Sequence, residues 1–347
     1  QGEVSLLQAR ADGTYAGIEA GGEYLVLSDE ELKDADDASS DSMTREQYIK
    51  WVMWMRDRER RVVEGRRALL KEKYAPLHPQ MYLFTEQDVF VPSFMAAAQA
   101  GTPEAVNAHC RRVAETGVYA FDMLQPAFCN LLLEELLHFL NSGLPCTPPN
   151  SMNKYGVILD ELGFSPVLRE WRRKYISAFA KVLFADCGGD TLDGHHAFLV
   201  GYSAKDGKHN DYANQHQQGD EGAHGEGDKD LGLHYDNSDV TLNVCLGKQF
   251  EAGDLFFCGL LDDPATHSEK LTVAHHVGQA LLHRGSHRHG ATQLTSGERF
   301  NLIIWCQSSE HQRMMHEHAH AHGQCGGHGH EHGGHDDDDR QRHVERK

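Results

Sequence analysis

The sequence predicts an α+β protein in which a mainly helical N-terminal half precedes an antiparallel β-sandwich or barrel. In the first half, apolar residues recur with helical spacing. After Cys187-Gly-Gly-Asp190 the pattern changes to short apolar runs, several of them rich in β-branched and aromatic residues. Because no helical segments separate these runs, we expect the strands that they form to pair antiparallel.

The helices are predicted from spacing and from their end signals. Thr44-Arg-Glu-Gln47 is a capping-box pattern that opens a long charged helix to about Tyr74, which we expect to dock along one edge. Ala-rich spacing predicts more helix from Asp88 to Val118. Pro126 to Asn141 is a clearer case, because it has a first-turn proline, leucines at i+4 and a Ser-Gly end. A further helix is predicted from Pro166 to Phe184.

The strands of the second half are predicted from apolar runs with Gly or charged breaks between them. They are Ala197–Tyr202, Val240–Leu246, Leu255–Cys258, Gln279–His283 and Phe300–Cys306.

Composition divides the 347 residues into four regions. We expect an N-terminal extension with an acidic linker at 1–43, a helical N-terminal region at 44–190, a β domain at 191–309 with a low-complexity insert at 205–230, and a disordered His-rich tail at 310–347. The linker, the insert and the tail have too few aliphatic residues to form a core.

Charge and cysteine usage exclude several classes of function. With 33 basic and 52 acidic residues, a formal charge of −19, the chain lacks the basic face of a nucleic-acid binder or of a protein that adheres to anionic membranes. No segment approaches the roughly 18 apolar residues of a membrane span. Eight scattered cysteines without a CxxC pair favour a reduced, intracellular and by default cytoplasmic protein. Because the sequence starts at Gln1, a trimmed targeting segment stays open.

The tail contains ten of the 25 histidines. Such a segment can chelate Zn²⁺ or Ni²⁺ loosely, and the alternative is a disordered tail without a specific metal role.

A redox iron site requires two histidines and one carboxylate on one face of the metal. Residues i and i+2 of a strand share a face, so His-x-Asp supplies two ligands from one short element. The pattern occurs as His209-Asn-Asp211, His234-Tyr-Asp236 and His335-Asp-Asp337. Only the second copy leads into a convincing strand, since the other two lie in the insert and the tail.

The third ligand should come from a later strand that faces the first. Gly278–Gly290 offers His283, His287 and His289 for this role. Ten residues beyond His289, Arg299 opens an apolar strand. Its guanidinium can bind a carboxylate bidentately, which suits a dicarboxylate held beside the metal.

These residues resemble the Fe(II)/2-oxoglutarate dioxygenases with a double-stranded β-helix (jelly-roll) core, specifically the prolyl and lysyl hydroxylase branch. That branch has H-x-D followed by H and, ten positions later, a basic residue. The resemblance selects His234, Asp236 and His289 as ligands of Fe(II), and Arg299 as the group that holds the distal carboxylate of 2-oxoglutarate.

The same resemblance suggests further contacts with the co-substrate. Ala197–Tyr202 resembles the strand that supplies a co-substrate-contacting tyrosine, so Tyr202 is a candidate. Asn243 is another, from a stretch similar to H-x-D-x-S-x-x-T-x-N. In a regular strand, however, its odd spacing places both it and Thr241 opposite His234, so a structural Asn243 and a packing role for Thr241 stay open. A substrate-side role for Asn153 and Tyr155 is a hypothesis, against an ordinary connector.

Several segments between about Leu77 and Gln307 resemble one member of this branch in particular. The resemblance implies hydroxylation of a protein or peptide side chain with consumption of O₂ and 2-oxoglutarate, release of succinate and CO₂, and support by L-ascorbate. The insert is longer than the resemblance leads us to expect, and the His-rich tail is not part of it.

Two alternatives remain. A catalytically silent metal-binding or scaffold protein could keep the barrel, but it would have no need to retain His234, Asp236, His289 and Arg299 together. A non-oxygenase barrel isomerase would not need an arginine at the distal carboxylate position.

Overall fold

The computed structural model of the chain describes residues 5–9, 15–18, 24–26, 45–83, 85–204 and 228–321. Its α-helices are α2 (Arg45–Lys73), α3 (Glu86–Val89), α4 (Pro92–Ala100), α5 (Pro103–His109), α6 (Pro126–Leu140), α7 (Ser165–Trp171), α8 (Ser177–Leu183) and α9 (Ser309–Ala321). A π-helical turn, Arg172–Ile176, joins α7 to α8. The first strands, β1 (Ser5–Ala9), β2 (Tyr15–Ile18) and β3 (Tyr24–Val26), form a small antiparallel sheet.

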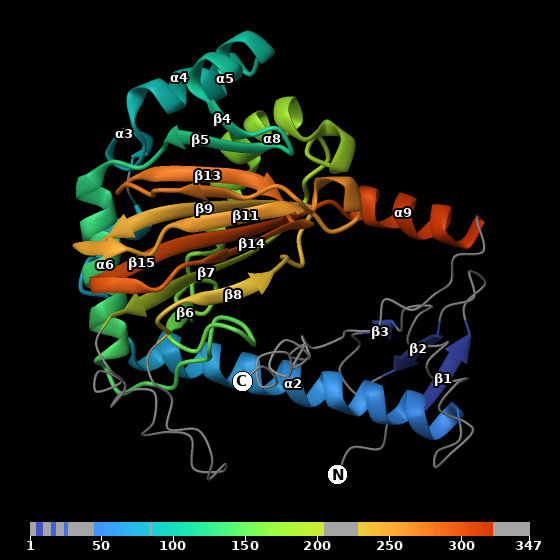
Figure 1. The fold of residues 1–347 in the computed structure, drawn as a ribbon. Coiled ribbons are helices and arrows are strands. Elements are labelled where there is room, and N and C mark those ends of the chain that lie inside the picture. Colours follow the sequence, from blue (N-terminus) through green and yellow to red (C-terminus); the bar gives the residue numbers. More distant parts are fainter. Residues whose placement is uncertain are drawn as a thin grey trace, which may run out of the picture.

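Two antiparallel sheets form the β domain (Figure 1). The large sheet has the order β4-β5-β13-β9-β15-β7-β6, and β10 pairs with β15. Its strands are β4 (Arg111–Ala114), β5 (Val118–Asp122), β6 (Gly156–Ile158), β7 (Gly194–Ser203), β9 (Val240–Gly247), β10 (Phe250–Ala252), β13 (Gln279–Arg284) and β15 (Leu294–Gln307). The small sheet has the order β12-β11-β14-β8 and consists of β8 (Leu231–His234), β11 (Leu255–Leu260), β12 (Leu271–Val273) and β14 (His287–Ala291).

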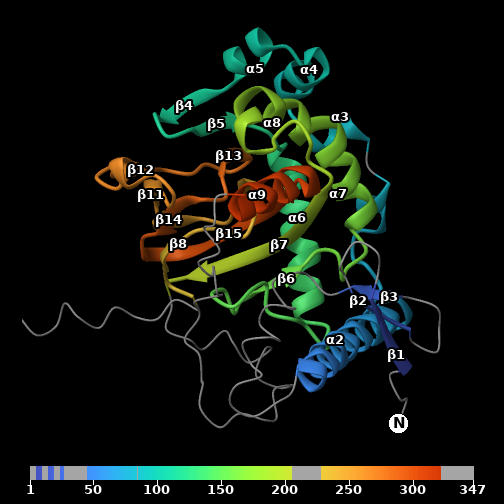
Figure 2. The ribbon, with the colours of Figure 1, turned by 90° about the vertical axis from the view of Figure 1, so that its right-hand side faces the viewer.

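The large sheet is covered on both faces. Figure 2 shows the small sheet on one side of it and helices α6, α7 and α8 on the other. Along β9, Val240, Leu242 and Val244 belong to the apolar core that includes the helices. Thr241 and Asn243, which alternate with them, therefore face the space between the two sheets. We call this space the barrel interior.

The chain passes from one sheet to the other between His234 and Val240. This crossing is held by backbone hydrogen bonds from Asp236 N to Gly285 O at 2.9 Å and from Gly285 N to Asp239 O at 3.1 Å. A Cβ atom at position 285 would lie 1.7 Å from Ser238 O, so only glycine permits this close approach.

The strands that the sequence predicts are present as β7, β9, β11, β13 and β15, and the fold is the double-stranded β-helix with a mainly helical N-terminal half. The predicted helix from Pro126 is α6. The helix predicted up to Val118 is wrong beyond α5. Residues 111–122 form the β4–β5 hairpin, because its second strand pairs with β13 and extends the large sheet.

The expectation of a disordered tail from 310 is wrong for its first turns, which form α9. The reason is a cap. Ser308 is buried, its Oγ accepts a hydrogen bond from His311 N at 3.0 Å, and its own N–H donates to Asp239 Oδ2 at 2.7 Å. The remaining tail (322–347), residue Thr44, the acidic patch of the linker and residues 205–227 of the insert lie outside the described residues.

Candidate functional site

The two candidate histidine ligands are direct neighbours across the small sheet. His234, the last residue of β8, pairs in register with His289 of β14. Their ring centroids are 4.3 Å apart, as expected for a cross-strand pair whose side chains share a face.

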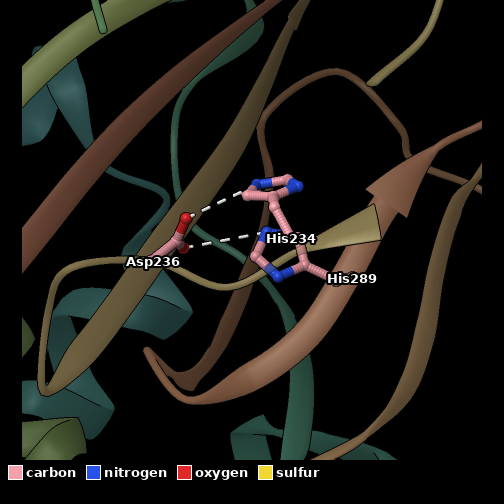
Figure 3. Close-up of side chains that lie close together, drawn as sticks. All are labelled: His234, Asp236 and His289. Carbon is pink, nitrogen blue, oxygen red and sulfur yellow. Dashed lines mark ion pairs between the residues drawn. The ribbon is translucent and has the colours of Figure 1, made fainter. Parts of the chain in front are cut away.

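Asp236 completes the group from the start of the crossing segment. Its Oδ1 lies 3.6 Å from His234 Nε2, and its Oδ2 lies 3.7 Å from His289 Nε2 (Figure 3). One ligand atom from each of the three residues lies within 4.8 Å of the other two. The structure thus brings together the two histidines and one carboxylate that the sequence pattern selected.

The neighbouring hydrogen bonds prepare these atoms for a cation. His234 Nδ1 donates to Gly232 O at 2.9 Å and His289 Nδ1 donates to His287 O at 2.8 Å, because a carbonyl oxygen can only accept. In the neutral rings, both Nε2 lone pairs are therefore free for a metal. Thr241 Oγ1 donates to Asp236 Oδ2 at 2.7 Å and orients the carboxylate.

The surroundings of the three residues shift their pKa values in different directions. Burial opposes ionisation of Asp236, but the His289 and His234 rings outweigh it and hold the pKa of this carboxyl well below its usual value. Burial lowers the pKa of His289 to about 4, so this ring is neutral at neutral pH. For His234, burial is outweighed by the hydrogen bond and charge of Asp236, which raise its pKa. Once His234 has lost its proton, two neutral imidazoles and a carboxylate lie on one face, which is the ligand set of a non-heme iron site, so the donors fit iron.

The other candidate histidines are buried but stand outside this group. His283 Nδ1 is bonded to the carbonyl of Arg284 at 2.8 Å, and His287 Nε2 lies 2.8 Å from Thr116 Oγ1. The register therefore agrees with the choice of His289. The two other His-x-Asp copies lie outside the described residues.

Arg299 lies in the barrel interior on β15. It is 1% exposed, and its strand neighbour in register is Tyr202 of β7. The guanidinium carbon lies 4.6 Å from the centroid of the Tyr202 ring, and Nη1 donates to Gly253 O. Its Nε is buried without a hydrogen-bond partner, and among the described residues Asp254 acts on it through its charge but forms no ion pair with it. A buried cation without an ion-pair partner costs several kcal/mol, so this side chain fits an anionic ligand.

The Tyr202 hydroxyl, beside Arg299, can donate a hydrogen bond. Burial raises the pKa of its hydroxyl to about 12, so it stays protonated. Asn153 Nδ2 donates to the hydroxyl oxygen at 3.2 Å, and Asn153 Oδ1 is in turn fixed by Asn150 Nδ2 at 3.2 Å. The Tyr202 hydrogen is thereby left to donate elsewhere.

The two candidate substrate-side residues are separated by the sheet. Asn153 is buried beside Tyr202, whereas the Tyr155 ring packs 6.1 Å from Phe300, a residue of the core shared with the helices. Tyr155 is thus not among the side chains gathered around Arg299.

Asn243 faces the barrel interior, contrary to the strand-parity argument. That argument treats His234 to Asn243 as one regular strand, but β8 ends at His234 and β9 begins in the other sheet at Val240. Thr241, interpreted from sequence as a packing residue, donates a hydrogen bond to the carboxylate of Asp236 instead.

Sequence reasoning also missed two residues next to Asn243. Asn301 Nδ2 donates to Asn243 Oδ1 at 2.6 Å, and His275 Nδ1 lies 3.3 Å from the same Asn301 Nδ2. The position of Asn301, two residues after Arg299, is the only signal that could have indicated it.

Comparison with known proteins agrees with this site. A model of the OGFOD2-like domain matches residues 70–189. The 2-oxoglutarate and iron-dependent oxygenase domain-containing protein 2 of Danio rerio is 37% identical over 256 residues, which are 72% of this chain and 68% of the relative. The chain belongs to the OGFOD2-like family of 2-oxoglutarate and iron-dependent oxygenase domain-containing proteins.

The family is named for 2-oxoglutarate and iron, which are the co-substrate and the metal that the site residues fit. The Homo sapiens member is 38% identical over 252 residues, 71% of this chain and 66% of the relative. In Arabidopsis thaliana, the 2-oxoglutarate and iron-dependent oxygenase domain-containing protein CP2 is 39% identical over 252 residues, 70% of this chain and 58% of the relative. The chain therefore spans about three fifths to two thirds of the length of these curated relatives. The member that the sequence segments resemble in particular is 2-oxoglutarate and iron-dependent oxygenase domain-containing protein 2, and this predicted resemblance is confirmed.

Two solved structures are similar to the chain at low sequence identity and with TM-scores below 0.5. A prolyl 4-hydroxylase from Phytophthora capsici is 16% identical with a TM-score of 0.40, covering 64% of this chain and 67% of its own. A prolyl hydroxylase from Trichoplax adhaerens, in complex with a hypoxia inducible factor peptide fragment, is 16% identical with a TM-score of 0.39, covering 62% and 94%. Among the described residues, no helix combines the length and apolar composition that crossing a membrane requires.

Proposed function

We propose that the chain is a 2-oxoglutarate-dependent hydroxylase that oxidises a side chain of a protein or peptide and releases succinate and CO₂. The observation that carries this proposal is that one barrel interior contains three residues able to hold a metal ion and a buried arginine that has no ion pair with any described residue. A cation held by the three residues, together with a dicarboxylate that binds both this cation and the arginine, would provide the missing charge partner for each group.

In this proposal His234, Asp236 and His289 hold Fe(II), and Arg299 binds the distal carboxylate of 2-oxoglutarate. Tyr202 and Asn243 donate hydrogen bonds to the same co-substrate. Bound iron, with O₂ and 2-oxoglutarate, supplies the oxidising power for the hydroxylation. The side chains contribute positioning, a fixed ligand tautomer and a site largely closed to water.

The substrate class rests on the sequence pattern that the chain shares with the prolyl and lysyl hydroxylase branch. The most direct test incubates candidate peptides with the protein, Fe(II), 2-oxoglutarate and ascorbate, and measures succinate and a peptide mass gain of one oxygen atom. We expect both with wild type and neither with Asp236→Ala. Arg173→Ala, which alters an exposed arginine paired with Glu170, is the matched surface control and should retain both. Equal succinate release by wild type and Asp236→Ala would contradict the proposal.

The alternative of a silent metal-binding protein makes the opposite prediction. Iron would then bind without succinate release, or would bind mainly through the His-rich tail. Metal analysis of a chain ending at Ala321, which keeps α9, separates these cases. We expect one tightly bound iron to remain after this truncation, and loss of all tight iron would favour the chelating tail.

A further inference from the structure

A chain of hydrogen bonds lies at the end of the barrel interior that contains Arg299, which we call the floor, and it ends at Asn243. It runs from the carbonyl of Gln279 to His275 Nε2 at 2.8 Å, from His275 Nδ1 to Asn301 Nδ2 at 3.3 Å, and from Asn301 Nδ2 to Asn243 Oδ1 at 2.6 Å. The three side chains are 5%, 1% and 7% exposed, so water does not compete for these bonds.

The direction of every bond is fixed by the first one. The Gln279 carbonyl can only accept, so His275 Nε2 carries the hydrogen. Burial lowers the pKa of His275 to about 3, so the ring is neutral and its Nδ1 must accept. Asn301 must then present its Nδ2. With its amide reversed, Oδ1 would face two acceptors, the His275 lone pair and Asn243 Oδ1.

This arrangement leaves Asn301 Oδ1 buried without a partner. The amide orientation is therefore not explained by the needs of Asn301 itself. It is explained by the needs of its two neighbours, since Asn301 supplies a donor to both.

The consequence for Asn243 is that its Oδ1 is occupied and its Nδ2 points elsewhere. Among the described residues, Asn243 Nδ2 forms no hydrogen bond. Thr241, Asn243 and Cys245 alternate along the interior face of β9, and Thr241 bonds the ligand Asp236 at one end of this row. At the other end, Cys245 pairs in register with Asn301 of β15, two residues from Arg299 on the same strand. Asn243 thus lies between the cation site and the arginine.

We propose that His275 and Asn301 are positioning residues that hold the amide of Asn243 in one orientation, with Nδ2 aimed at an oxygen of 2-oxoglutarate bound between iron and Arg299. This inference deepens the proposed function and rests on it. It assigns to two buried residues, neither of which contacts the metal ligands, a role in binding the co-substrate.

The test is calorimetric titration of 2-oxoglutarate into the full-length Zn²⁺-loaded protein, which needs no turnover. Asn243→Ala should weaken 2-oxoglutarate binding about tenfold, because a donor to a charged ligand is lost. Asn301→Leu and His275→Leu should weaken it about threefold to tenfold, because Asn243 can then turn its oxygen toward the ligand. His275→Gln offers both an acceptor and a donor and should restore most of the affinity.

A double-mutant cycle distinguishes positioning from a general structural effect. If Asn301 acts through Asn243, then the double variant Asn243→Ala/Asn301→Leu should bind 2-oxoglutarate no more weakly than Asn243→Ala alone. Zn²⁺ affinity and the thermal midpoint serve as folding controls, and Asn301→Ser replaces Asn301→Leu if the latter does not fold.

The possible failures are distinguishable. Additive losses in the cycle, or wild-type affinity in Asn243→Ala or in both His275→Leu and Asn301→Leu, would overturn this inference while leaving the proposed function intact. Absence of 2-oxoglutarate binding to the wild-type protein would overturn both.

Discussion

The two ends of the barrel interior are both polar and buried, but they differ in charge balance. At the cation end, the Asp236 carboxylate faces the Nε2 atoms of His234 and His289 at 3.6 and 3.7 Å, so a negative charge and two ring nitrogens lie close together. At the floor, Arg299 stacks on Tyr202 and reaches a backbone carbonyl, but it has no ion pair with a described carboxylate.

This difference indicates what each end lacks. The cation end has three lone-pair donors facing one another, an arrangement that is favourable only with a positive charge among them. The floor has a guanidinium removed from water, which is favourable only with a negative charge beside it. The cation end lacks a positive charge and the floor lacks a negative one. The two together are more informative than either alone, because a dicarboxylate that chelates a metal ion supplies both.

The largest effect is expected from Arg299→Ala, which removes the charge at the floor. Removing one member of a buried charge pair costs about 2–5 kcal/mol, so the KM for 2-oxoglutarate should rise about 30-fold or more. Zn²⁺ affinity should stay within about twofold, because the cation end is untouched. Steady-state succinate release and metal titration measure the two quantities.

Arg299→Lys is the informative companion, since it keeps the charge and loses the bidentate fork. We expect an intermediate KM for it. A KM unchanged in both variants would refute the assignment of the floor to the co-substrate.

The next largest effect is expected at the other end, from Thr241→Val. This change removes the hydroxyl that orients Asp236 and leaves the volume nearly the same. Loss of such a partner typically costs about 10- to 100-fold in metal affinity, and that is the expected loss here. Metal titration measures it, with Thr241→Ser as the control that keeps the hydroxyl. Equal losses in the Val and Ser variants would show that packing, and not the hydrogen bond, matters at this position.

A smaller effect is expected from Tyr202→Phe, which keeps the ring beside Arg299 and removes its hydroxyl. Loss of one hydrogen bond costs about 1 kcal/mol, so 2-oxoglutarate should bind about fivefold more weakly in the Zn²⁺-loaded protein. Tyr119→Phe, on a tyrosine that packs against Phe184 near the edge of the large sheet, should bind as wild type does. If both variants bind alike, the Tyr202 hydroxyl is not a co-substrate contact.

The cation end could largely be predicted from sequence because its residues follow local rules. His234 and Asp236 are two residues apart beside a strand, and the spacing from His289 to Arg299 is part of a family pattern. The structure brings the first three together and places Arg299 in the same interior. The strands of the β domain were predictable for the same reason, since each is a separate apolar run.

The two residues that hold Asn243 could not be predicted in this way. Asn301 and His275 lie in apolar or loop sequence that resembles any buried strand or connector, and they meet Asn243 only because three elements converge. The strand-parity rule failed at Asn243 because the chain changes sheets between two strands that look continuous in sequence. In the N-terminal half, pairing with β13 decides the conformation of residues 111–122, and that partner is far away in sequence.

The smallest predicted effect separates the two ends by the sign of their pH dependence in the metal-free protein. His275, at the floor, has a pKa lowered by burial to about 3, with Arg299 and His276 adding to the shift. The unfolded chain binds a proton at this histidine below about pH 6.5 and the folded one does not, so its contribution to the unfolding free energy falls by about 0.8 kcal/mol from about pH 7.5 to about pH 6.

His234, at the cation end, has its pKa raised by Asp236 in spite of burial. Its stabilising contribution is therefore fully present below the unfolded pKa of about 6.5 and is lost as the pH rises through the folded pKa. In chelator-treated protein, urea unfolding at these two pH values should show that His275→Gln loses less stability than wild type on acidification and that His234→Gln loses more. If both variants lose more stability than wild type on acidification, or both lose less, then the two histidines have pKa values shifted in the same direction. The two ends would then not differ in electrostatic character.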